Sequence, residues 1–521
     1  MVYVIILSVV AGVLGIYYFL FKDLDFFRKN GIPHLKPLPL VGNLGPWFLG
    51  LQSVADLMKK LYDKNHEAKY IGFYDMTRPV VMLRDIELIK SIALKNFELF
   101  PDHSVFVRED QDPFFSRNLF SLQGDRWREV RAILSPAFTS SKMKSMFKLM
   151  SDYGVQFANF MAQLPPEQRL MIDTKDVFSK YTNDVIATCA FGVSVDSMRD
   201  PKNLFYVYGR ETTILDSVSS IKFYIFRNLP WLARLIRLKF IREPISKFFC
   251  DLVETTVKVR DEKGIVRPDM LQLMMESRGK KEGGEDLSIA DMTSQAFSFF
   301  FGGFDSTSTL MCFAAHEIAV NEEVQKRLQN EIDQVLENTN GGAPYDAVNR
   351  MEYLDAVISE TLRRYPIFAA LDRVCIRDFE LPPTLPGAKP FIMKEGQTVW
   401  IPVYGLQHDP KYFEEPEKFN PDRFLGEQKK HALSTGAYLP FGLGPRMCIG
   451  NRFASLKTKV LLFHLLARCD LLPCEKTLIP LVLAKDGFNM TAEGGFWLEI
   501  TPRKNAHRSI AVNNANDTCE L

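Results

Sequence analysis

The fold of this 521-residue chain is decided by a glycine-rich stretch near its C-terminus, Phe441-Gly-Leu-Gly-Pro-Arg-Met-Cys-Ile-Gly450. The stretch places one thiol, Cys448, just before a helical pattern over 452–468. Glycine tolerates close contacts and positive φ, so the backbone can approach a flat ligand here. A cysteine near a helix N-terminus is favoured as the thiolate, a strong soft ligand for a transition metal. The alternative is a small hydrophobe buried in a turn, which describes most intracellular cysteines.

The composition is that of a large globular protein and excludes some classes of partner. Hydrophobic residues make up 46% of the chain, enough for an extensive core, and the formal net charge is +1. A nucleic-acid partner is not expected, because domains that bind nucleic acid carry a basic excess. The 8 cysteines are scattered without a CxxC pair, which is typical of free thiols. No linker divides the chain, so one large domain is expected.

An uncharged apolar run over residues 2–21 predicts a membrane anchor. Twenty helical residues at about 1.5 Å each span roughly the 30 Å hydrocarbon core of a bilayer. A cleaved signal peptide would need a basic start, a shorter apolar run and a cleavage site of small residues. Basic residues follow at Lys22, Arg28 and Lys29, so the body of the protein should face the cytosol. We therefore expect an anchor over 1–21 and a stiff, proline-rich hinge over 22–44.

Hydrophobic periodicity predicts a mainly helical body with small sheets. The clearest patterns in the first hundred residues are strands over 68–74 and 80–83 and helices over 54–62 and 86–95. Successive amphipathic helices follow over 145–275. A polar tail over 504–521 is expected to be disordered.

Two pairs of residues at helical spacing have both a functional and an ordinary interpretation. Trp127 and Arg131 share one helical face, where an indole N–H and a guanidinium can hold a carboxylate. A surface helix with one buried tryptophan fits the same residues. Glu360 and Arg363 lie three apart in a helical pattern over 349–365 and form an ion pair that, if exposed, contributes about 0–1 kcal/mol.

A long helical pattern over 288–321 contains two adjacent glycines, Gly302 and Gly303, followed by Asp305 and Ser306. Each glycine inside a helix costs about 1 kcal/mol relative to alanine, so a close approach or a bend is expected there. The approaching group is either a ligand, with Asp305 and Ser306 as a short proton relay in an aromatic wall, or a neighbouring helix.

These motifs, in this order and spacing, resemble those of the cytochrome P-450 family. The string Phe-x-x-Gly-x-Arg-x-Cys-x-Gly over 441–450, followed by Ala454, is similar to the family's haem-binding loop, whose cysteine is the axial thiolate of the iron. The resemblance implies a mainly α fold with small β-sheets, as one large domain over 45–503 carried on the N-terminal transmembrane helix. The arrangement is most similar to microsomal forms from insects.

The resemblance also implies residues that hold haem b. Cys448 would ligate the iron, while the Trp127–Arg131 helix and Arg373 would bind the two propionates. The full set of cofactor-binding residues expected from the family is Trp127, Arg131, Gly302, Gly303, Arg373, Phe441, Gly442, Gly444, Arg446, Gly450 and Ala454.

Proton delivery is expected from Asp305 and Ser306, with Thr307 as a rival to Ser306. Ser306 stands where the family has threonine, so the hydroxyl remains and the methyl is lost. The family resemblance also makes Glu360, Arg363 and Arg423 a buried structural trio. The substrate pocket expected from the aromatic-rich middle of the chain and its neighbours consists of Phe114, Phe115, Phe301, Phe304, Phe368, Ala369 and Phe488.

The implied activity is that of a membrane-bound monooxygenase, which inserts one oxygen atom from O2 into a lipophilic xenobiotic or lipid-like compound. The chain has no strand-GxGxxG-helix unit, so electrons should come from NADPH–cytochrome P-450 reductase, with cytochrome b5 as a further donor. The family places such enzymes at the endoplasmic reticulum membrane. The alternatives are a haem-thiolate isomerase or dehydratase that acts on peroxides and a non-catalytic haem sensor.

Two surfaces are predicted for these partners. A basic patch of Arg126, Arg128, Lys142, Lys457 and Lys459 is expected to receive the reductase. The segment 222–247, rich in basic and apolar residues, is either a helix on the membrane surface or an ordinary packed helix with a charged outer face.

Overall fold

The computed structural model describes residues 24–105, 107–213, 221–222, 224–226, 229–278, 287–485, 487 and 489–504, together with positions 3, 6, 7, 10–12 and 15. Most of the predicted anchor over 1–21 therefore lies outside the described residues, as do Phe488 and the tail beyond Lys504. Within the part of the chain that is described, no helix combines the length and the apolarity needed to cross a membrane.

The predicted mainly helical fold with small sheets is confirmed. The helices are α2 Phe26–Lys29, α3 Gly45–Phe48, α4 Val54–Tyr62, α5 Ile86–Lys90, α6 Pro113–Ser116, α7 Gly124–Leu134, α8 Ser140–Gln163, α9 Pro166–Arg169, α10 Thr174–Ile186, α11 Leu204–Thr213, α13 Pro230–Leu235, α14 Glu243–Lys263, α15 Met270–Glu276, α16 Ile289–Val320, α17 Glu322–Asn338, α18 Tyr345–Asn349, α19 Glu352–Arg364, α20 Val403–Gln407, α21 Gly426–Ser434 and α22 Asn451–Arg468.

The largest sheet has four strands in the order β1-β2-β7-β4, namely Tyr70–Asp75, Arg78–Leu83, Thr398–Ile401 and Leu371–Val374. β1 and β2 form an antiparallel hairpin, β7 runs parallel to β2, and β4 returns antiparallel to β7. The described part of the predicted hinge packs on this sheet, where Pro33 accepts a hydrogen bond from Gly72 and Asn43 donates one to Tyr74. This segment is therefore part of the folded body.

The remaining strands form two small sheets. β8 Cys469–Pro473 and β3 Ile172–Asp173 both pair antiparallel with β9 Trp497–Pro502. β5 Phe379–Leu381 and β6 Phe391–Met393 form a separate two-stranded ribbon.

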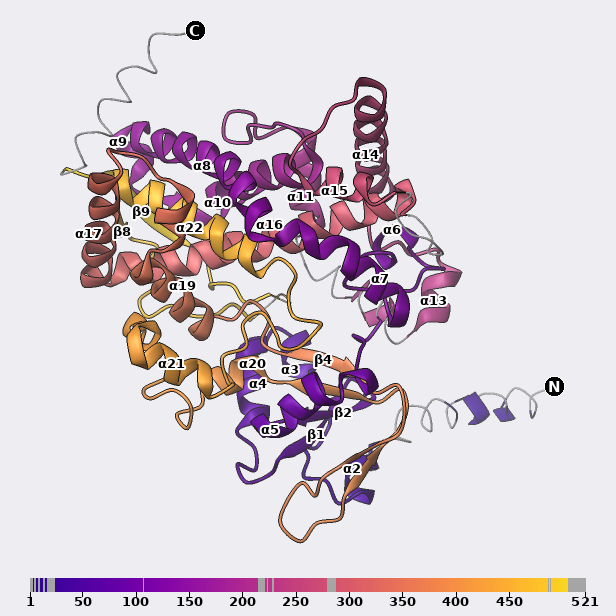
Figure 1. The fold of residues 1–521 in the computed structure, drawn as a ribbon. Helices are drawn as coiled ribbons and strands as arrows, with labels where there is room; N and C mark the ends of the chain where they lie inside the picture. Colours follow the sequence, from indigo (N-terminus) through magenta and orange to yellow (C-terminus); the bar gives the residue numbers. More distant parts are fainter. Residues whose placement is uncertain are drawn as a thin grey trace.

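Helix α16 lies inside the helix-rich part of the molecule, with α8 and α10 on one side and α19 on the other (Figure 1). Ser288 starts it through a capping box, in which its hydroxyl accepts from the Asp291 N–H and the Asp291 carboxylate accepts from the Ser288 N–H. Most of its side chains between Met292 and Ala319 are buried, because the sequence is apolar on nearly every face. α16 thus carries its glycine pair through the centre of the fold.

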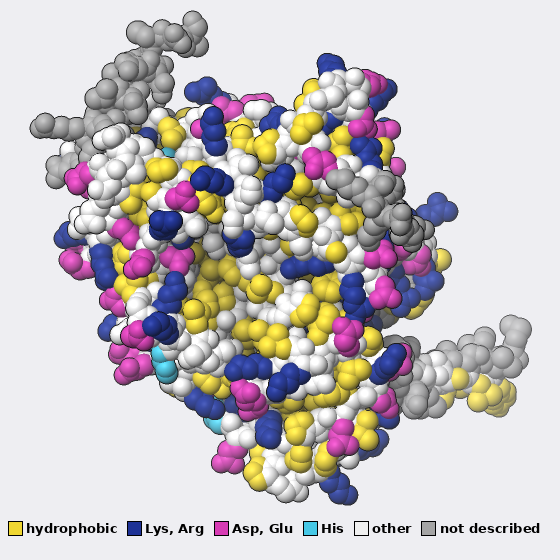
Figure 2. All heavy atoms as spheres, in the orientation of Figure 1, with side chains coloured by type: hydrophobic (Ala, Val, Ile, Leu, Met, Phe, Trp, Pro, Cys, Tyr) yellow, Lys and Arg dark blue, Asp and Glu magenta, His cyan; other side chains and the backbone are white. Residues whose placement is uncertain are grey.

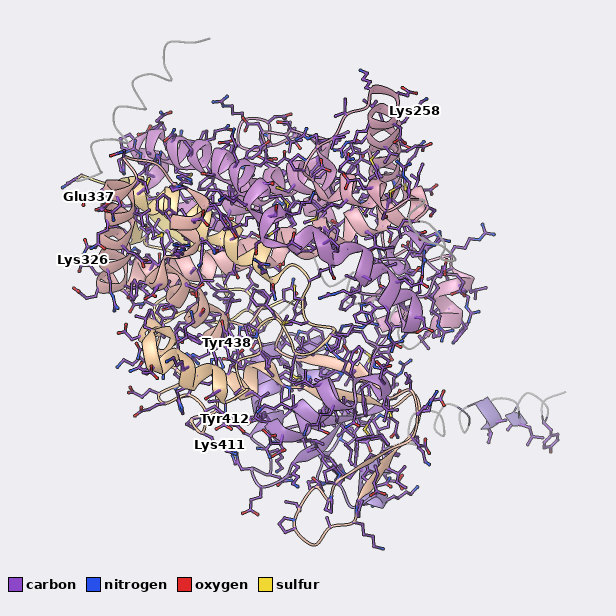
Figure 3. All side chains as sticks on the ribbon, in the orientation of Figure 1. Lys258, Lys326, Glu337, Lys411, Tyr412 and Tyr438 are labelled. Atoms are coloured by element: carbon purple, nitrogen blue, oxygen red, sulfur yellow. The ribbon has the colours of Figure 1, made fainter. Side chains whose placement is uncertain are left out.

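The molecule has a helix-rich part and a smaller part that contains the four-stranded sheet (Figure 1). The side chains of Lys326 and Glu337, on α17, project at the outer edge of the first part, and those of Lys411 and Tyr412 project from the second (Figure 3). Figure 2 shows apolar atoms along a hollowed band across the middle of this face, between the two parts.

The prediction of one basic helix over 222–247 is wrong. α13 ends at Leu235, Arg237 has a φ of 50°, and the Leu238 N–H donates to the Ala233 carbonyl. A left-handed residue together with a hydrogen bond to a carbonyl five residues earlier is a common way to end a helix. The basic and apolar residues are therefore divided between helical positions 222 and 224–226, α13, a short loop and the start of α14.

Candidate active site

The loop that carries Cys448 is held by backbone hydrogen bonds. The Cys448 N–H donates to the Phe441 carbonyl over 2.9 Å, and the Met447 N–H donates to Gly444 over 2.9 Å. Gly444 has a φ of 76°, and a Cβ there would lie 2.2 Å from the Ala93 carbonyl oxygen. Gly444 therefore allows protein backbone to pack closely, a role that the sequence analysis had assigned to a ligand.

The Cys448 thiol is exposed, and α22 begins just beyond it with Gly450 as its N-cap. The Ala454 N–H donates to Gly450 in the first turn. Although the thiol is open to solvent, desolvation by the protein atoms around it raises the pKa of Cys448, and the Gly450 N–H and the charge of Arg131 oppose this shift. The Gly450 N–H at the start of α22 acts in the expected direction, toward the thiolate, while desolvation acts against it. Coordination to a metal would overcome this cost.

The two adjacent glycines of α16 lie on different faces of the helix and have different surroundings. Gly302 has no atom within 4 Å of the place where a Cβ would stand, whereas a Cβ on Gly303 would lie 3.1 Å from Ile186 of α10. Four residues on, Ser306 donates to the Gly302 carbonyl and Thr307 to the Gly303 carbonyl. Thr307 is only 3% exposed, while Ser306 is partly accessible. Gly302 and Ser306 thus share the open face of the helix, and Thr307 lies on the packed face.

Asp305 is held by two residues that the sequence analysis missed. Its Oδ1 lies 2.8 Å from Lys175 Nζ, and its Oδ2 accepts from Asn489 over 2.7 Å. The same Lys175 amine donates to the hydroxyls of Ser308 and Thr309. The carboxylate therefore joins α10 and the C-terminal loop to α16.

Three donors near the Cys448 loop have unused hydrogen-bonding capacity. Arg131, on α7, makes no side-chain hydrogen bond or ion pair with any other described residue, and its charge acts on the Cys448 thiol. Within the same part of the chain, the indole N–H of buried Trp127 has no acceptor. Arg373 is almost fully buried and its Nε has no partner, although another of its nitrogens donates to the Asp372 carbonyl. Such donors suit a ligand that carries carboxylates.

Arg446, which was expected to contact the cofactor, is engaged mainly with protein. It donates to the Asp102 carboxylate over 2.7 Å and to the carbonyls of Pro101 and Leu122, and its guanidinium lies 4.0 Å from the centre of the Trp127 ring. Burial lowers the pKa of Arg446 to about 10, although Asp102 opposes the shift. Arg446 therefore fastens the Cys448 loop to the segment that precedes α7.

His103, which no sequence motif indicated, lies beside Arg373. His103 Nδ1 lies 2.8 Å from the Asp372 carboxylate, which also accepts from the Ser104 N–H. Burial alone would raise the pKa of Asp372, but the hydrogen bonds from His103 and Ser104 lower it well below its usual range. This contact fixes the segment around residue 103 to β4, the strand that presents Arg373.

The predicted pocket aromatics fall into separate groups. The rings of Phe115 and Phe301 lie 5.6 Å apart, edge to face, and the Phe114 ring lies 4.7 Å from that of Phe297. Phe304 packs elsewhere, stacked on Phe300 at 5.2 Å. Phe368 is 53% exposed, and Ala369 is buried with its carbonyl bonded to the Tyr404 N–H. Phe488 lies outside the described residues.

The structure brings Glu360, Arg363 and Arg423 together. Arg363 Nε lies 2.8 Å from Glu360, with both side chains fully buried, and Arg423 Nε lies 3.5 Å from the same carboxylate. Arg363 also donates to the carbonyls of Gln407 and Pro416. These bonds tie α19 to the chain that leads into the Cys448 loop.

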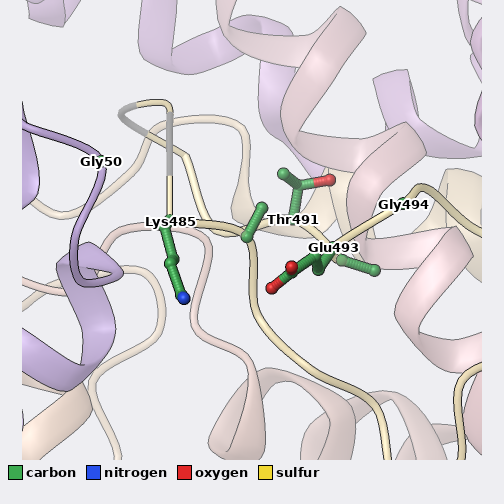
Figure 4. Close-up of a pocket in the computed structure, with 7 residues that line it drawn as sticks. Gly50, Lys485, Thr491, Glu493 and Gly494 are labelled. Atoms are coloured by element: carbon green, nitrogen blue, oxygen red, sulfur yellow. The ribbon is translucent and has the colours of Figure 1, made fainter.

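A separate cavity of about 280 Å³ lies between Gly50 and the turn that carries Lys485, Thr491 and Glu493 (Figure 4). None of the predicted site residues lines it. The same turn reaches α16 through Asn489, so this surface cavity adjoins a contact of Asp305.

The comparison with known proteins decides the family. The sequence model of the family Cytochrome P450 matches residues 32–498. The chain belongs to the cytochrome P450 family. It is 43% identical to Cytochrome P450 9e2 of Blattella germanica, over 92% of this chain and 94% of that protein. It is 39% identical to Probable cytochrome P450 9f2 of Drosophila melanogaster, over 92% of this chain and 95% of that protein. It is 35% identical to Cytochrome P450 6j1 of Blattella germanica, over 96% of this chain and 99% of that protein. The expected resemblance to insect forms is confirmed.

Cytochrome P450 enzymes are oxidoreductases of the monooxygenase type, and they bind haem whose iron is held by a cysteine thiolate. The described residues fit this group in three ways. An exposed thiol stands on a loop at a helix N-terminus, unpaired donors for carboxylates lie near it, and Gly302 leaves open space beside α16. These groups have the chemistry that a thiolate-ligated haem requires, namely a thiol and donors for carboxylates.

Two of the five residues of the predicted basic patch do not reach the surface. Lys457 and Lys459 are buried, because α22 is enclosed on nearly all faces. Arg126 is paired with Glu129 and Asp291, and Arg128 with Asp125 and Glu98. Lys457 and Lys459 are therefore not part of a surface patch, and Arg126 and Arg128 share their charge with acidic neighbours, while Lys142 forms no ion pair with any described residue.

Proposed function

We propose that this cytochrome P450 inserts one oxygen atom of O2 into a lipophilic small molecule, a xenobiotic or a lipid-like compound, with Cys448 as the iron ligand. The observation that carries the proposal is the accessible Cys448 thiol beside Arg131, a cation without an acidic partner among the described residues. Electrons come from NADPH–cytochrome P-450 reductase, with cytochrome b5 as a further donor.

In this proposal the side chains near Cys448 bind and orient the cofactor. Bound haem, ligated by the thiolate, supplies the reductive activation of dioxygen. The free N–H groups of Trp127, Arg131 and Arg373 would hold its propionates. Arg446 supports the site indirectly, because it holds the Cys448 loop against Asp102 and the Trp127 ring.

Ser306 is the proposed source of the proton that oxygen cleavage requires. Its hydroxyl lies on the open face of α16 and donates to the Gly302 carbonyl, a bond that can be exchanged for one to a ligand by rotation about χ1. Asp305 is the next group along the chain and is held by Lys175 and Asn489. Thr307 has the same hydroxyl on the packed face, so we assign it a structural role.

The substrate wall is proposed to include Phe114, Phe115 and Phe301. Their rings are clustered near the N-terminal half of α16 and offer no hydrogen-bonding side chain, so they favour an apolar ligand and exclude water. Phe368, which is half exposed, is a further wall residue in this proposal.

An isotope experiment tests the proposed reaction. The purified protein is reconstituted with reductase and NADPH, and a panel of apolar compounds is first screened for a shift of the haem spin state. Compounds that bind are then turned over under ¹⁸O2, and one labelled atom per product molecule is expected. Product that forms without NADPH and without label would instead mean a rearrangement of peroxides. Binding without turnover of any compound would favour a sensor.

We further propose that residues 1–21 anchor the protein in the endoplasmic reticulum membrane and that α13 touches the lipid surface. Trp231 and Leu235 are 60% and 71% exposed, and basic Arg234 lies beside them. Deletion of residues 1–21 should leave weak, salt-sensitive binding to anionic vesicles. Replacement of both Trp231 and Leu235 by Ser in the deleted protein should abolish that binding. Unchanged vesicle binding would contradict the role of α13.

A further inference from the structure

Lys457 is a completely buried lysine on α22 that the proposed reaction does not use. Its Nζ donates a hydrogen bond of 2.9 Å to the carbonyl of Gly303, in the glycine pair of α16. α22 starts directly after the Cys448 loop, whereas Gly303 precedes the proton-delivery residues. One side chain therefore connects the helix of the iron ligand with the helix that carries Ser306.

The surroundings of Lys457 do not explain it as an ion pair. No carboxylate of the described residues forms a salt bridge with it, and its amine lies 5.5 Å from the centre of the Phe453 ring. Burial lowers its pKa well below the usual value, and the nearby Cys189 thiol only partly opposes this shift. A neutral amine still has two N–H donors and can hold a carbonyl without a counter-ion. Lys457 thus serves as a buried hydrogen-bond donor.

The bond acts on the turn of α16 that sets the position of Ser306. The Gly303 carbonyl already accepts from the Thr307 hydroxyl, so two side chains converge on one helix carbonyl. Side chains that bond a helix carbonyl compete with the ladder of backbone hydrogen bonds and bend the helix locally. The adjacent carbonyl, that of Gly302, accepts from Ser306. A shift of the Gly303 peptide would therefore move the Ser306 hydroxyl.

We propose that Lys457 is a positioning residue for proton delivery, which acts through the Gly303 carbonyl to hold the Gly302–Gly303 turn and the Ser306 hydroxyl in place. This inference rests on the proposed function, in which Ser306 delivers the proton. It assigns no contact between Lys457 and substrate or cofactor.

Three substitutions distinguish the effect of losing the N–H donor of Lys457 from the effect of changing the volume of its side chain. Lys457→Met keeps most of the volume and removes the donor. Lys457→Gln retains an N–H donor one bond closer to the backbone than the lysine amine, and Lys457→Asn places the same amide a further methylene away from the Gly303 carbonyl. The matched control is Lys459→Met, because Lys459 is also buried on α22 but bonds to Asn349 and Asp355, away from α16.

All variants are assayed as holoenzymes with reductase for product and hydrogen peroxide formed per NADPH. Productive turnover consumes O2, two electrons and two protons to give hydroxylated product and water, whereas uncoupled turnover returns the same electrons and protons as hydrogen peroxide. For Lys457→Met we expect product yield to fall toward the ~10²-fold loss that a misplacement of about 1 Å can cause, with a matching rise in peroxide. Lys457→Gln should be better coupled than Lys457→Met, and Lys459→Met should remain coupled.

A second measurement does not depend on turnover. Hydrogen–deuterium exchange of the peptide over 302–307 should be faster in Lys457→Met than in the wild type, and unchanged in Lys459→Met. If Lys457→Met fails to fold, the comparison passes to Lys457→Gln and Lys457→Asn, of which the first should be the better coupled. Equal coupling and equal exchange in these pairs would overturn the inference. The spectrum of the reduced, carbon monoxide-bound wild type tests the proposed function separately.

Discussion

The guanidinium of Arg363 lies 2.8 Å from the carboxylate of Glu360, and both side chains are completely buried. The pair stands three residues apart on α19, and Arg363 also reaches the carbonyls of Gln407 and Pro416. An exposed pair at this spacing contributes little, whereas a buried one leaves an uncompensated charge when one partner is removed. The location of the pair, which its spacing does not reveal, makes it structural.

Arg363→Met should therefore lose about 3–5 kcal/mol of stability, because Glu360 would be buried without its main partner. The measurement is the yield of haem-containing protein together with the midpoint of thermal unfolding. Lys326→Met is the control, since Lys326 pairs with Glu322 on the exposed face of α17. A normal yield of Arg363→Met with an unchanged midpoint would contradict the assigned role.

Cys448→Ser should abolish the red-shifted Soret band of the reduced, carbon monoxide-bound protein, because that band is the signature of thiolate-ligated haem iron. Cys474→Ser is a suitable control, since Cys474 is a half-buried free cysteine in the loop after β8. If Cys448→Ser keeps the thiolate spectrum, the iron is held elsewhere and the proposed site is wrong.

Ser306→Ala should keep substrate binding and electron uptake, while product formation falls about 10²-fold, the lower end of the contribution of a general acid. Hydrogen peroxide should rise in proportion, and Ser306→Thr should remain coupled. Thr307→Ala is the matched comparison, because Thr307 makes the same bond to a glycine carbonyl from the packed face. Coupled turnover in Ser306→Ala together with uncoupled turnover in Thr307→Ala would show that Thr307, and not Ser306, delivers the proton.

The buried histidines His316, His408 and His464 predict a loss of stability in mild acid. Burial lowers their pKa values to about 4, 3 and 3, whereas each titrates near 6.5 when the chain is unfolded. The unfolded state binds more protons below pH 6.5, so the free energy of unfolding decreases as the pH falls toward 4. At pH 5 each histidine should cost about 2 kcal/mol.

Urea unfolding between pH 7 and pH 5 measures this dependence. His464→Gln should make it less steep, because one buried imidazole is removed. His66→Gln should leave it unchanged, since His66 is exposed. Identical slopes for the wild type and His464→Gln would show that His464 is not buried as a neutral group.

Much of the fold could be predicted because its signals are local. The helix predicted over 54–62 has the same first and last residues as α4. The helix predicted over 288–321 corresponds to α16 together with its N-cap and C-cap residues. Periodicity and a capping box are properties of neighbouring residues, so the sequence alone contains them. The Cys448 loop was found in the same way, from the order of its glycines, proline and arginine.

The sequence alone thus determined the helical architecture and the cytochrome P450 family, and it singled out Cys448 as the proposed iron ligand. Only the tertiary structure decided which groups face the site. In the folded protein Ser306 lies on the open face of α16 and Thr307 on its packed face, and Asp305 contacts Lys175 and Asn489. Lys457, which was expected on the surface, is completely buried. The physical reason is that burial and hydrogen bonding depend on segments far apart in the chain, and these segments meet only in the folded protein.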